Sequence, residues 1–194
     1  MVMVSICSDY WIGRFFMKCI ETELAEVLVF EPQRFGDERG FFMETFRQSY
    51  FDACFTERGF SLPIFVQENH SRSQQNVLRG LHFQRLQPQG KLVRVCTGSI
   101  FDVAVDIRAN SPTYGQWVGR VLSADNRLQM WTPPGFAHGF YVLSEFADVI
   151  YRCTDYYAPH DEYVLGWNNT DFSIDWPLIA EPLLSDRDAI AART

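Results

Sequence analysis

The sequence predicts an all-β fold, a sandwich or barrel of short strands. Turn-forming residues recur at short intervals, for example at Gly36, Gly59, Gly98, Pro112 and Gly135. Between these turns lie short runs rich in Val, Ile, Phe and Tyr, a rhythm typical of β-sandwiches and barrels. No internal repeat, low-complexity stretch or linker interrupts the chain, so we expect a single domain.

Two segments show the alternation expected of strands. In "IFDVAVDIR" (100–108) apolar and polar residues alternate, and "FADVIYRC" (146–153) follows the same pattern. Successive side chains of a strand point to opposite faces. In the first segment, one face would carry Phe101, Val103, Val105 and Ile107, and the other Asp102, Asp106 and Arg108.

Two other segments predict short helices. "TFRQSYFDACFTERGF" (45–60) lacks alternation, and Gly59 near its end suits the position that follows a helix C-cap. "LLSDRDAIAAR" (183–193) predicts a C-terminal helix with Ser185 as its N-cap.

Composition excludes several classes of protein. The net charge is −7 and no run of Lys or Arg occurs, so we expect no nucleic-acid partner. No apolar run approaches the ~20 residues of a membrane span, and the N-terminus lacks a signal-peptide cleavage pattern. The five cysteines are widely spaced without a Cys-x-x-Cys pair, which favours free thiols in a reducing cytoplasm.

The histidines argue against a metal centre. "PPGFAHGF" has the Pro-x-Gly-x-x-His form of a second cupin motif, ending at His138. Metal-binding cupins also carry a His-x-His pair and a downstream Glu, whereas the first-motif region here offers only His82. A three-histidine site would have to recruit His70 or His160. We therefore expect no metal and no cofactor.

Three polar side chains lie on otherwise apolar faces of expected strands. Each alone is also explained by a structural role: a lysine reaching solvent, a buried tyrosine with a bonded hydroxyl, or a core histidine. A base, a cation and a phenol together favour acid–base catalysis. The residues, with their expected face neighbours, are Lys91 with Val93 and Val95, Tyr151 with Val149 and Cys153, and His82 with Leu78 and Gln84.

Further polar residues gather in "FGDERGFFMETF" and "FVQENHSRS". With Arg79, they supply two guanidinium forks and several side-chain amides, and such forks suit phosphate oxygens. For Arg39, a surface ion pair with nearby acids remains the alternative. The residues are Arg39, Glu44, Gln67, Asn69 and Arg79.

Five long motifs resemble one family in their order along the chain. They are "FGDERGFFMETF", "VQENHSRSQQNVLRGLHFQ", "GKLVRVCTGSIFDVAVDIRANSPTYGQW", "PPGFAHGFYVLSE" and "YYAPHDE", and they resemble dTDP-4-dehydrorhamnose 3,5-epimerases. The resemblance implies a cupin-like jelly-roll β-sandwich with a few short peripheral helices. It runs over residues 17–194, a single jelly-roll epimerase domain, and leaves residues 1–16 as an N-terminal extension for which no structure is predicted.

The resemblance implies a metal-free epimerisation in dTDP-L-rhamnose biosynthesis. C3 and C5 of dTDP-4-dehydro-6-deoxy-D-glucose would be inverted to give dTDP-4-dehydro-L-rhamnose, by proton abstraction α to the C4 ketone and reprotonation on the opposite face. His82 matches the base, Asp188 its carboxylate partner, Lys91 the cation near the ketone oxygen, and Tyr151 the opposite proton donor.

The resemblance also implies the substrate contacts and the oligomer. Tyr157 matches an aromatic that stacks on thymine, and Arg187 stands where the family commonly has Lys. The family forms homodimers in which an N-terminal strand joins the partner's sheet. The implied substrate-binding residues are Arg39, Glu44, Gln67, Glu68, Asn69, Arg79, Lys91, His138, Tyr157, Glu162 and Arg187.

Three alternatives remain at this stage. An epimerase that inverts only C3 or only C5 would keep the same base and acid. A catalytically silent protein that binds sugar nucleotides would be favoured by loss of His82 or Tyr151, and both are present. A metal-dependent cupin isomerase or oxygenase is disfavoured by the missing His-x-His pair.

The stretch "VLRGLHFQ" (77–84) makes a geometric prediction. Arg79 and His82 are three residues apart, so in a regular strand their side chains would point to opposite faces. If both reach one site, the strand must bulge between them, and Gly80 is the residue that permits it.

Overall fold

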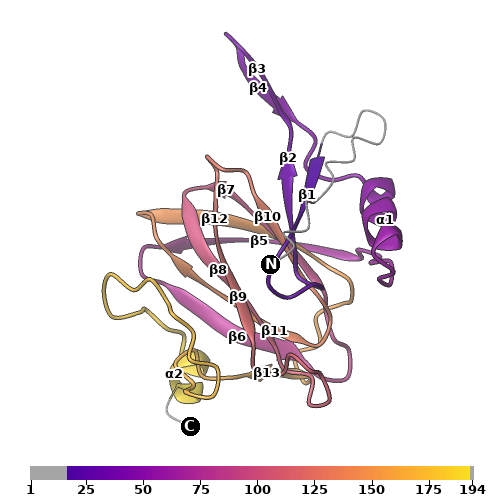
Figure 1. The fold of residues 1–194 in the computed structure, drawn as a ribbon. Coiled ribbons are helices and arrows are strands. Elements are labelled where there is room, and N and C mark those ends of the chain that lie inside the picture. The colour runs from indigo at the N-terminus through magenta and orange to yellow at the C-terminus, as the bar shows by residue number, and fades with distance from the viewer. Residues whose placement is uncertain (1–16, 193–194) are drawn as a thin grey trace, which may run out of the picture.

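The structure is a computed structural model that describes residues 17–192, so the expected extension, residues 1–16, lies outside the described residues. Two antiparallel sheets face each other, and a separate hairpin and two short helices lie at the periphery (Figure 1). This arrangement confirms the predicted all-β sandwich with a few short helices.

The two sheets contain six and five strands. The six-stranded sheet has the order β1 (Met17–Glu21), β2 (Leu28–Pro32), β10 (Gln129–Thr132), β7 (Lys91–Thr97), β12 (Phe146–Cys153) and β5 (Gln67–Gln74). The five-stranded sheet has the order β13 (Glu162–Val164), β6 (Leu78–Gln84), β11 (Phe136–Val142), β8 (Ser99–Asp106) and β9 (Trp117–Ser123).

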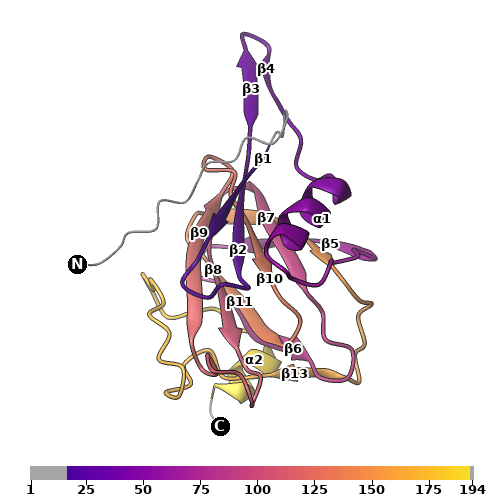
Figure 2. The same ribbon diagram turned by 45° about the vertical axis from the view of Figure 1, so that its right-hand side comes forward.

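A hairpin extends away from the sandwich. Its strands, β3 (Arg34–Asp37) and β4 (Gly40–Met43), project beyond the end of the sheets that lies opposite α2 (Asp186–Ala191) (Figures 1 and 2). Phe41 and Phe42 of this hairpin are 58% and 69% exposed. A lone two-stranded hairpin has no core of its own in which such rings could be buried.

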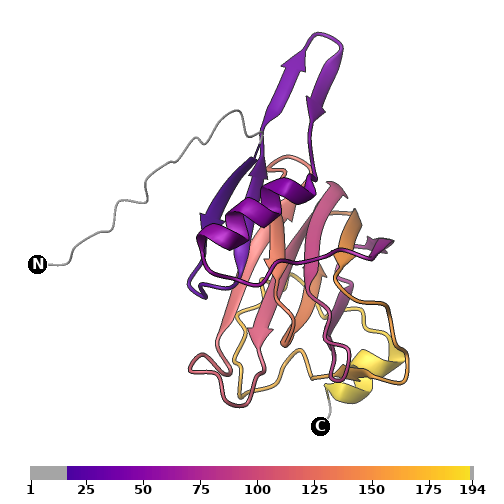
Figure 3. The same cartoon turned by 90° about the vertical axis from the view of Figure 1, so that its right-hand side faces the viewer.

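Helix α1 (Gln48–Glu57) covers the outer face of the six-stranded sheet (Figure 3). Phe51 and Phe55 pack there against Phe30 and Trp131. The N–H groups of Gly59 and Phe60 donate to the carbonyls of Thr56 and Phe55, and Gly59 has φ +71°. This is the Schellman end expected of a C′ glycine, so the predicted helix and its stop are confirmed.

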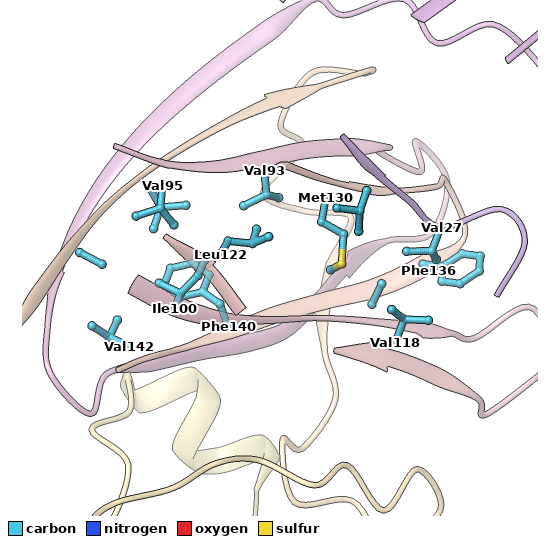
Figure 4. Close-up of a cluster of buried hydrophobic side chains, with 14 of the residues drawn as sticks. Val27, Val93, Val95, Ile100, Val118, Leu122, Met130, Phe136, Phe140 and Val142 are labelled. Atoms are coloured by element: carbon cyan, nitrogen blue, oxygen red, sulfur yellow. The ribbon is translucent and has the colours of Figure 1, made fainter. Parts of the chain in front are cut away.

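The main core lies between the two sheets. Apolar side chains of both inner faces fill it, as Figure 4 shows for Val93, Met130, Ile100 and Phe140. Both faces of β8 are nevertheless buried. Val103 and Val105 contact an outer cluster with Phe172 and Trp176, and Asp102 is fully buried on the inward face.

The predicted faces of β8 are therefore confirmed, and the structure adds which of them turns inward. The apolar face turns outward and is covered by the C-terminal segment, whose Phe172 and Trp176 contact it. The face with the acids turns inward, alongside Ile100 and Ala104.

Strand β6 bulges where it was expected to. Arg79 pairs with Phe140 and His82 with His138, so two residues of β6 oppose one of β11. Gly80 has φ +132°, and a Cβ there would lie 2.6 Å from the Cα of Gly139. The bulge directs both Arg79 and His82 inward, because their partners Phe140 and His138 lie on the inner face.

One face assignment was wrong for the same reason. Leu78 belongs to the outer cluster, whereas His82 lies beside the inward His138. The prediction that these two residues share a face assumed a regular strand, and the bulge reverses the alternation between them.

The C-terminal segment ends in helix α2, beside β6 and β13 (Figure 1). The side chain of Ser185 accepts a hydrogen bond from the N–H of Asp188, which confirms the predicted N-cap. Within residues 17–192, no helix is both long and apolar enough to cross a membrane.

Candidate active site

Polar side chains gather on the inner faces of the two sheets, together with one residue of α2. We call this group the inner polar cluster. It comprises Arg79 and His82 of β6, Lys91 of β7, Asp102 of β8, His138 of β11, Tyr151 of β12, Glu162 of β13 and Asp188 of α2.

His82 and Asp188 form a hydrogen-bonded pair. Nε2 of His82 lies 2.7 Å from Oδ1 of Asp188. The imidazole is 29% exposed, while the carboxylate is almost fully buried at 2%. Burial would raise the pKa of Asp188, but hydrogen bonds from His82, the Ser185 hydroxyl and the Gly80 N–H hold this pKa below its ordinary value. An ionised Asp188 therefore accepts the Nε2–H of His82 and leaves Nδ1 as the free base.

A second histidine–carboxylate pair lies directly beside the first. His138 is the cross-strand neighbour of His82, and its Nε2 lies 2.8 Å from Oδ1 of Asp102. The Asp102 side chain is completely buried. Sequence reasoning did not select Asp102: it placed this residue on one face of the strand but did not show that this face turns inward, alongside Ile100 and Ala104.

Lys91 and Tyr151 reach the cluster from the opposite sheet. Lys91 pairs in register with Cys153, two residues from Tyr151 on the same face of β12. Burial lowers the pKa of the Lys91 ammonium, although Cys153, Glu162 and Asp102 raise it. Burial raises the pKa of the Tyr151 phenol. The predicted face neighbours Val93, Val95 and Val149 are all in the inner core, as expected.

Glu162 links two residues at the edge of the cluster. Its carboxylate accepts a hydrogen bond from the Tyr157 hydroxyl at 2.9 Å and forms an ion pair with Arg187. Burial would raise the pKa of Glu162, yet Arg187 and Tyr157 hold it below its ordinary value. Tyr157 is 48% exposed, so its ring is accessible for stacking.

Strand β5 presents amides beside Tyr151. Asn69 pairs in register with Tyr151, and the Gln67 side-chain amide donates to Oδ1 of Asn69 at 3.0 Å. Further along β5, the Ser73 hydroxyl accepts a hydrogen bond from Nε of Arg79 at 3.0 Å. Arg79, Gln67 and Asn69 thus lie with the cluster.

Three predicted substrate-binding residues do not join the cluster. Arg39 lies in the turn between β3 and β4, where it pairs with Asp37, and Glu44 follows β4 and pairs with Arg47. Glu68 alternates with Gln67 and Asn69 on β5, so it points to the outer face, where it pairs with Arg152 at 2.6 Å.

His70, His82 and His138 each lie within hydrogen-bonding distance of a carboxylate. His70 lies on the outer face of β5, 3.1 Å from Asp148. Within residues 17–192 no group of three or more His, Cys, Asp and Glu side chains is arranged to hold a metal ion. The chemistry that the cluster supplies itself is acid–base chemistry: two His–carboxylate pairs, a buried ammonium and a buried phenol.

The sandwich and its inner polar cluster define an acid–base enzyme on a jelly-roll scaffold. Residues 21–194 match the model of the dTDP-4-dehydrorhamnose 3,5-epimerase family. The chain therefore belongs to this family, whose members are isomerases.

Individual relatives agree with the family match. A dTDP-4-dehydrorhamnose 3,5-epimerase of Pseudomonas aeruginosa is 54% identical over 174 residues, which cover 89% of this chain and 93% of the relative. A solved dTDP-6-deoxy-D-glucose-3,5-epimerase of Legionella pneumophila, in complex with dTDP-4-keto-L-rhamnose, has a TM-score of 0.86 and 51% identity, covering 90% of each chain. The likeness confirms the predicted cupin-like jelly roll.

A narrower enzyme also shares the fold. The solved structure of a 3′-monoepimerase from Streptomyces bikiniensis, in complex with dTDP-quinovose, has a TM-score of 0.80 and 32% identity, covering 88% of this chain and 84% of that one. The jelly roll alone therefore does not decide how many carbons are inverted.

Proposed function

We propose that this protein inverts C3 and C5 of dTDP-4-dehydro-6-deoxy-D-glucose to give dTDP-4-dehydro-L-rhamnose, in dTDP-L-rhamnose biosynthesis. The observation that carries this proposal is the placement of His82, hydrogen-bonded to Asp188 of α2, on one sheet and of Lys91 and Tyr151 on the other. A base and a proton donor on opposite sheets suit a reaction that removes a proton from one face of a sugar and returns one to the other.

His82 acts as the base in this proposal. Its Nδ1 accepts the proton from the carbon next to the C4 ketone, and the C–H electron pair moves to form the enolate. Asp188 accepts the Nε2–H throughout, so it fixes the tautomer and stabilises the imidazolium that forms. The same pair serves C3 and C5, because both carbons flank the same ketone.

Lys91 and Tyr151 complete the reaction in this proposal. The Lys91 ammonium stabilises the negative charge on the enolate oxygen, an effect that is large where water is excluded. The Tyr151 hydroxyl then delivers a proton to the opposite face of the carbon. Its raised pKa keeps the phenol protonated at neutral pH, as a proton donor must be.

The nucleotide is bound by residues around the cluster in this proposal. The guanidinium groups of Arg79 and Arg187 pair with the diphosphate, and the exposed ring of Tyr157 stacks on the thymine, a contact typically contributing roughly 1–3 kcal/mol. The remaining polar contacts come from Gln67, Asn69, His138 and Glu162.

Arg39 and Glu44 support the proposal of a homodimer. Both lie at the projecting hairpin, away from their own cluster (Figures 1 and 2). Phe41 and Phe42 beside them are largely exposed, and a second copy of the chain would cover them. In such a dimer the hairpin carries Arg39 and Glu44 to the partner's site.

We place the protein in the cytoplasm, in accord with the free thiols of Cys19, Cys54, Cys96 and Cys153.

Deuterium incorporation tests the reaction directly. The protein is incubated with dTDP-4-keto-6-deoxyglucose in D₂O, and the sugar is followed by NMR. Incorporation at C3 and C5 with formation of the L-rhamno product is the expected result. Incorporation at one carbon alone would mean that the protein is a monoepimerase. Incorporation at neither carbon would mean that the protein binds the nucleotide sugar without catalysis.

A further inference from the structure

Two cysteines lie next to each other on the side of the six-stranded sheet that faces away from the inner polar cluster. Cys19 belongs to β1 and Cys54 to α1, and their sulfur atoms are 2.9 Å apart. Cys54 is 5% exposed, and Cys19 is half-buried beside it. The proposed reaction uses neither residue.

The surroundings make the two thiols unequal. Nη1 of Arg58 lies 3.3 Å from the Cys54 sulfur. The hydrogen bond with Cys19 and the positive charge of Arg58 hold the pKa of Cys54 below its ordinary value, against burial and the charges of Glu57 and Glu21. The same hydrogen bond and burial raise the pKa of Cys19. A thiolate beside a protonated thiol is the arrangement of an attacking and a resolving cysteine.

We propose that Cys19 and Cys54 form an oxidisable pair that closes an intramolecular disulfide by exchange with a small disulfide such as oxidised glutathione. The Cys54 thiolate attacks one glutathione sulfur, forms a mixed disulfide and releases one glutathione thiolate. Cys19 then loses its proton and attacks the Cys54 sulfur, which releases the second glutathione. Two protein thiols are oxidised and one glutathione disulfide is reduced to two thiols.

Closing the bond from this geometry requires little movement of the two sulfur atoms. A disulfide bond is about 2.05 Å long, so the two sulfurs have to approach by about 1 Å from their separation of 2.9 Å. The loop that the bond would close contains the whole β3–β4 hairpin and, with it, Arg39 and Glu44. Both ends of the segment that bears the hairpin would then be joined covalently against the six-stranded sheet.

Peptide mapping tests the proposal. Trypsin cleaves after Lys18, Arg34, Arg47 and Arg58, so residues 19–34 and 48–58 are separate peptides with one cysteine each. The protein is treated with oxidised glutathione, its remaining thiols are alkylated, and it is digested without reductant. We expect the two peptides to be joined by a disulfide that dithiothreitol breaks. Recovery of both as alkylated peptides, or of Cys54 as a stable glutathione adduct, would overturn the proposal.

Matched variants separate this pair from Cys7 and Cys96, and Cys153 is kept because it is fully buried. The reaction is run in a Cys7→Ser, Cys96→Ser background, because Cys96 is exposed and Cys7 lies outside the described residues. The background should still form the 19–54 link, and Arg58→Gln should slow its formation several-fold. Equal rates of disulfide formation with and without Arg58 would show that Arg58 does not activate Cys54.

Stability gives a second readout that does not depend on mapping. Oxidation should shift the urea midpoint of the background protein upward, because the cross-link restricts the unfolded chain. Cys19→Ser in the same background should show no such shift. An equal shift in both proteins would assign the effect to another modification and overturn the proposal.

Discussion

His82 and His138 are direct cross-strand neighbours, and each is hydrogen-bonded through Nε2 to its own buried carboxylate. The two pairs consist of the same groups, but their exposure to solvent differs. The His82 ring is 29% exposed and the His138 ring 9%. The more accessible ring is the better candidate for direct proton abstraction.

The two histidines are therefore expected to behave differently when replaced. His82→Asn should lower the rate of deuterium exchange roughly 10²–10⁴-fold, the usual contribution of a general base, with little change in KM. His138→Asn should mainly raise KM, because we assign it to binding. Single-turnover exchange measured by NMR checks both, and the opposite pattern would make His138 the base.

Tyr151→Phe separates proton removal from inversion. The ring and its packing against the core are kept, but the donor of the second proton is lost. We expect His82 still to exchange the substrate proton for deuterium on its own face, while formation of the inverted product falls roughly 10²-fold or more. Comparing deuterium content with product stereochemistry checks this. Inversion at the normal rate would remove Tyr151 as the donor.

Lys91 is expected to set an alkaline limit on activity. Burial lowers the pKa of its ammonium, so the charge is lost as pH rises through a value below the ordinary ~10.4 of lysine. Tyr151, with a raised pKa, stays protonated over that range. The profile of kcat/KM against pH should therefore fall on the alkaline side. Lys91→Arg keeps its charge at higher pH, so its residual activity should not fall there. If kcat/KM of this variant still fell at the same alkaline pH, a group other than Lys91 would cause the fall.

Gly80 is expected to be intolerant of any side chain. A Cβ at Gly80 would lie 2.6 Å from the Cα of Gly139, at a φ of +132°. Gly80→Ala should reduce the free energy of unfolding by at least about 2 kcal/mol and lower activity through the misdirection of His82. Gly59→Ala is the matched control: its φ is also positive, but nothing lies within 4 Å, so about 1 kcal/mol is expected. Urea unfolding of both variants checks the difference. Similar losses would mean that the bulge is not tightly packed.

Local chemistry explains which features the sequence could predict. The stop at Gly59 and the cap at Ser185 depend on nearby backbone groups, and the bulge at Gly80 follows from a spacing of three residues. The inward direction of Asp102 was not predicted, because it depends on Phe172 and Trp176 covering the other face of β8, and these residues come from a distant part of the chain. The positions of Arg39 and Glu44 follow from a hairpin whose direction no local pattern encodes.

The His82–Asp188 bond joins residues 106 positions apart, and this separation makes activity a reporter of folding. A chain whose sheets have formed but whose α2 has not docked holds His82 without its orienting carboxylate. During refolding, recovery of proton exchange therefore follows the docking of α2. The fluorescence of Trp131, recorded in a variant whose other tryptophans are replaced by Phe, follows packing around α1. A lag between the two signals would measure how long this long-range contact takes to form after the core has packed.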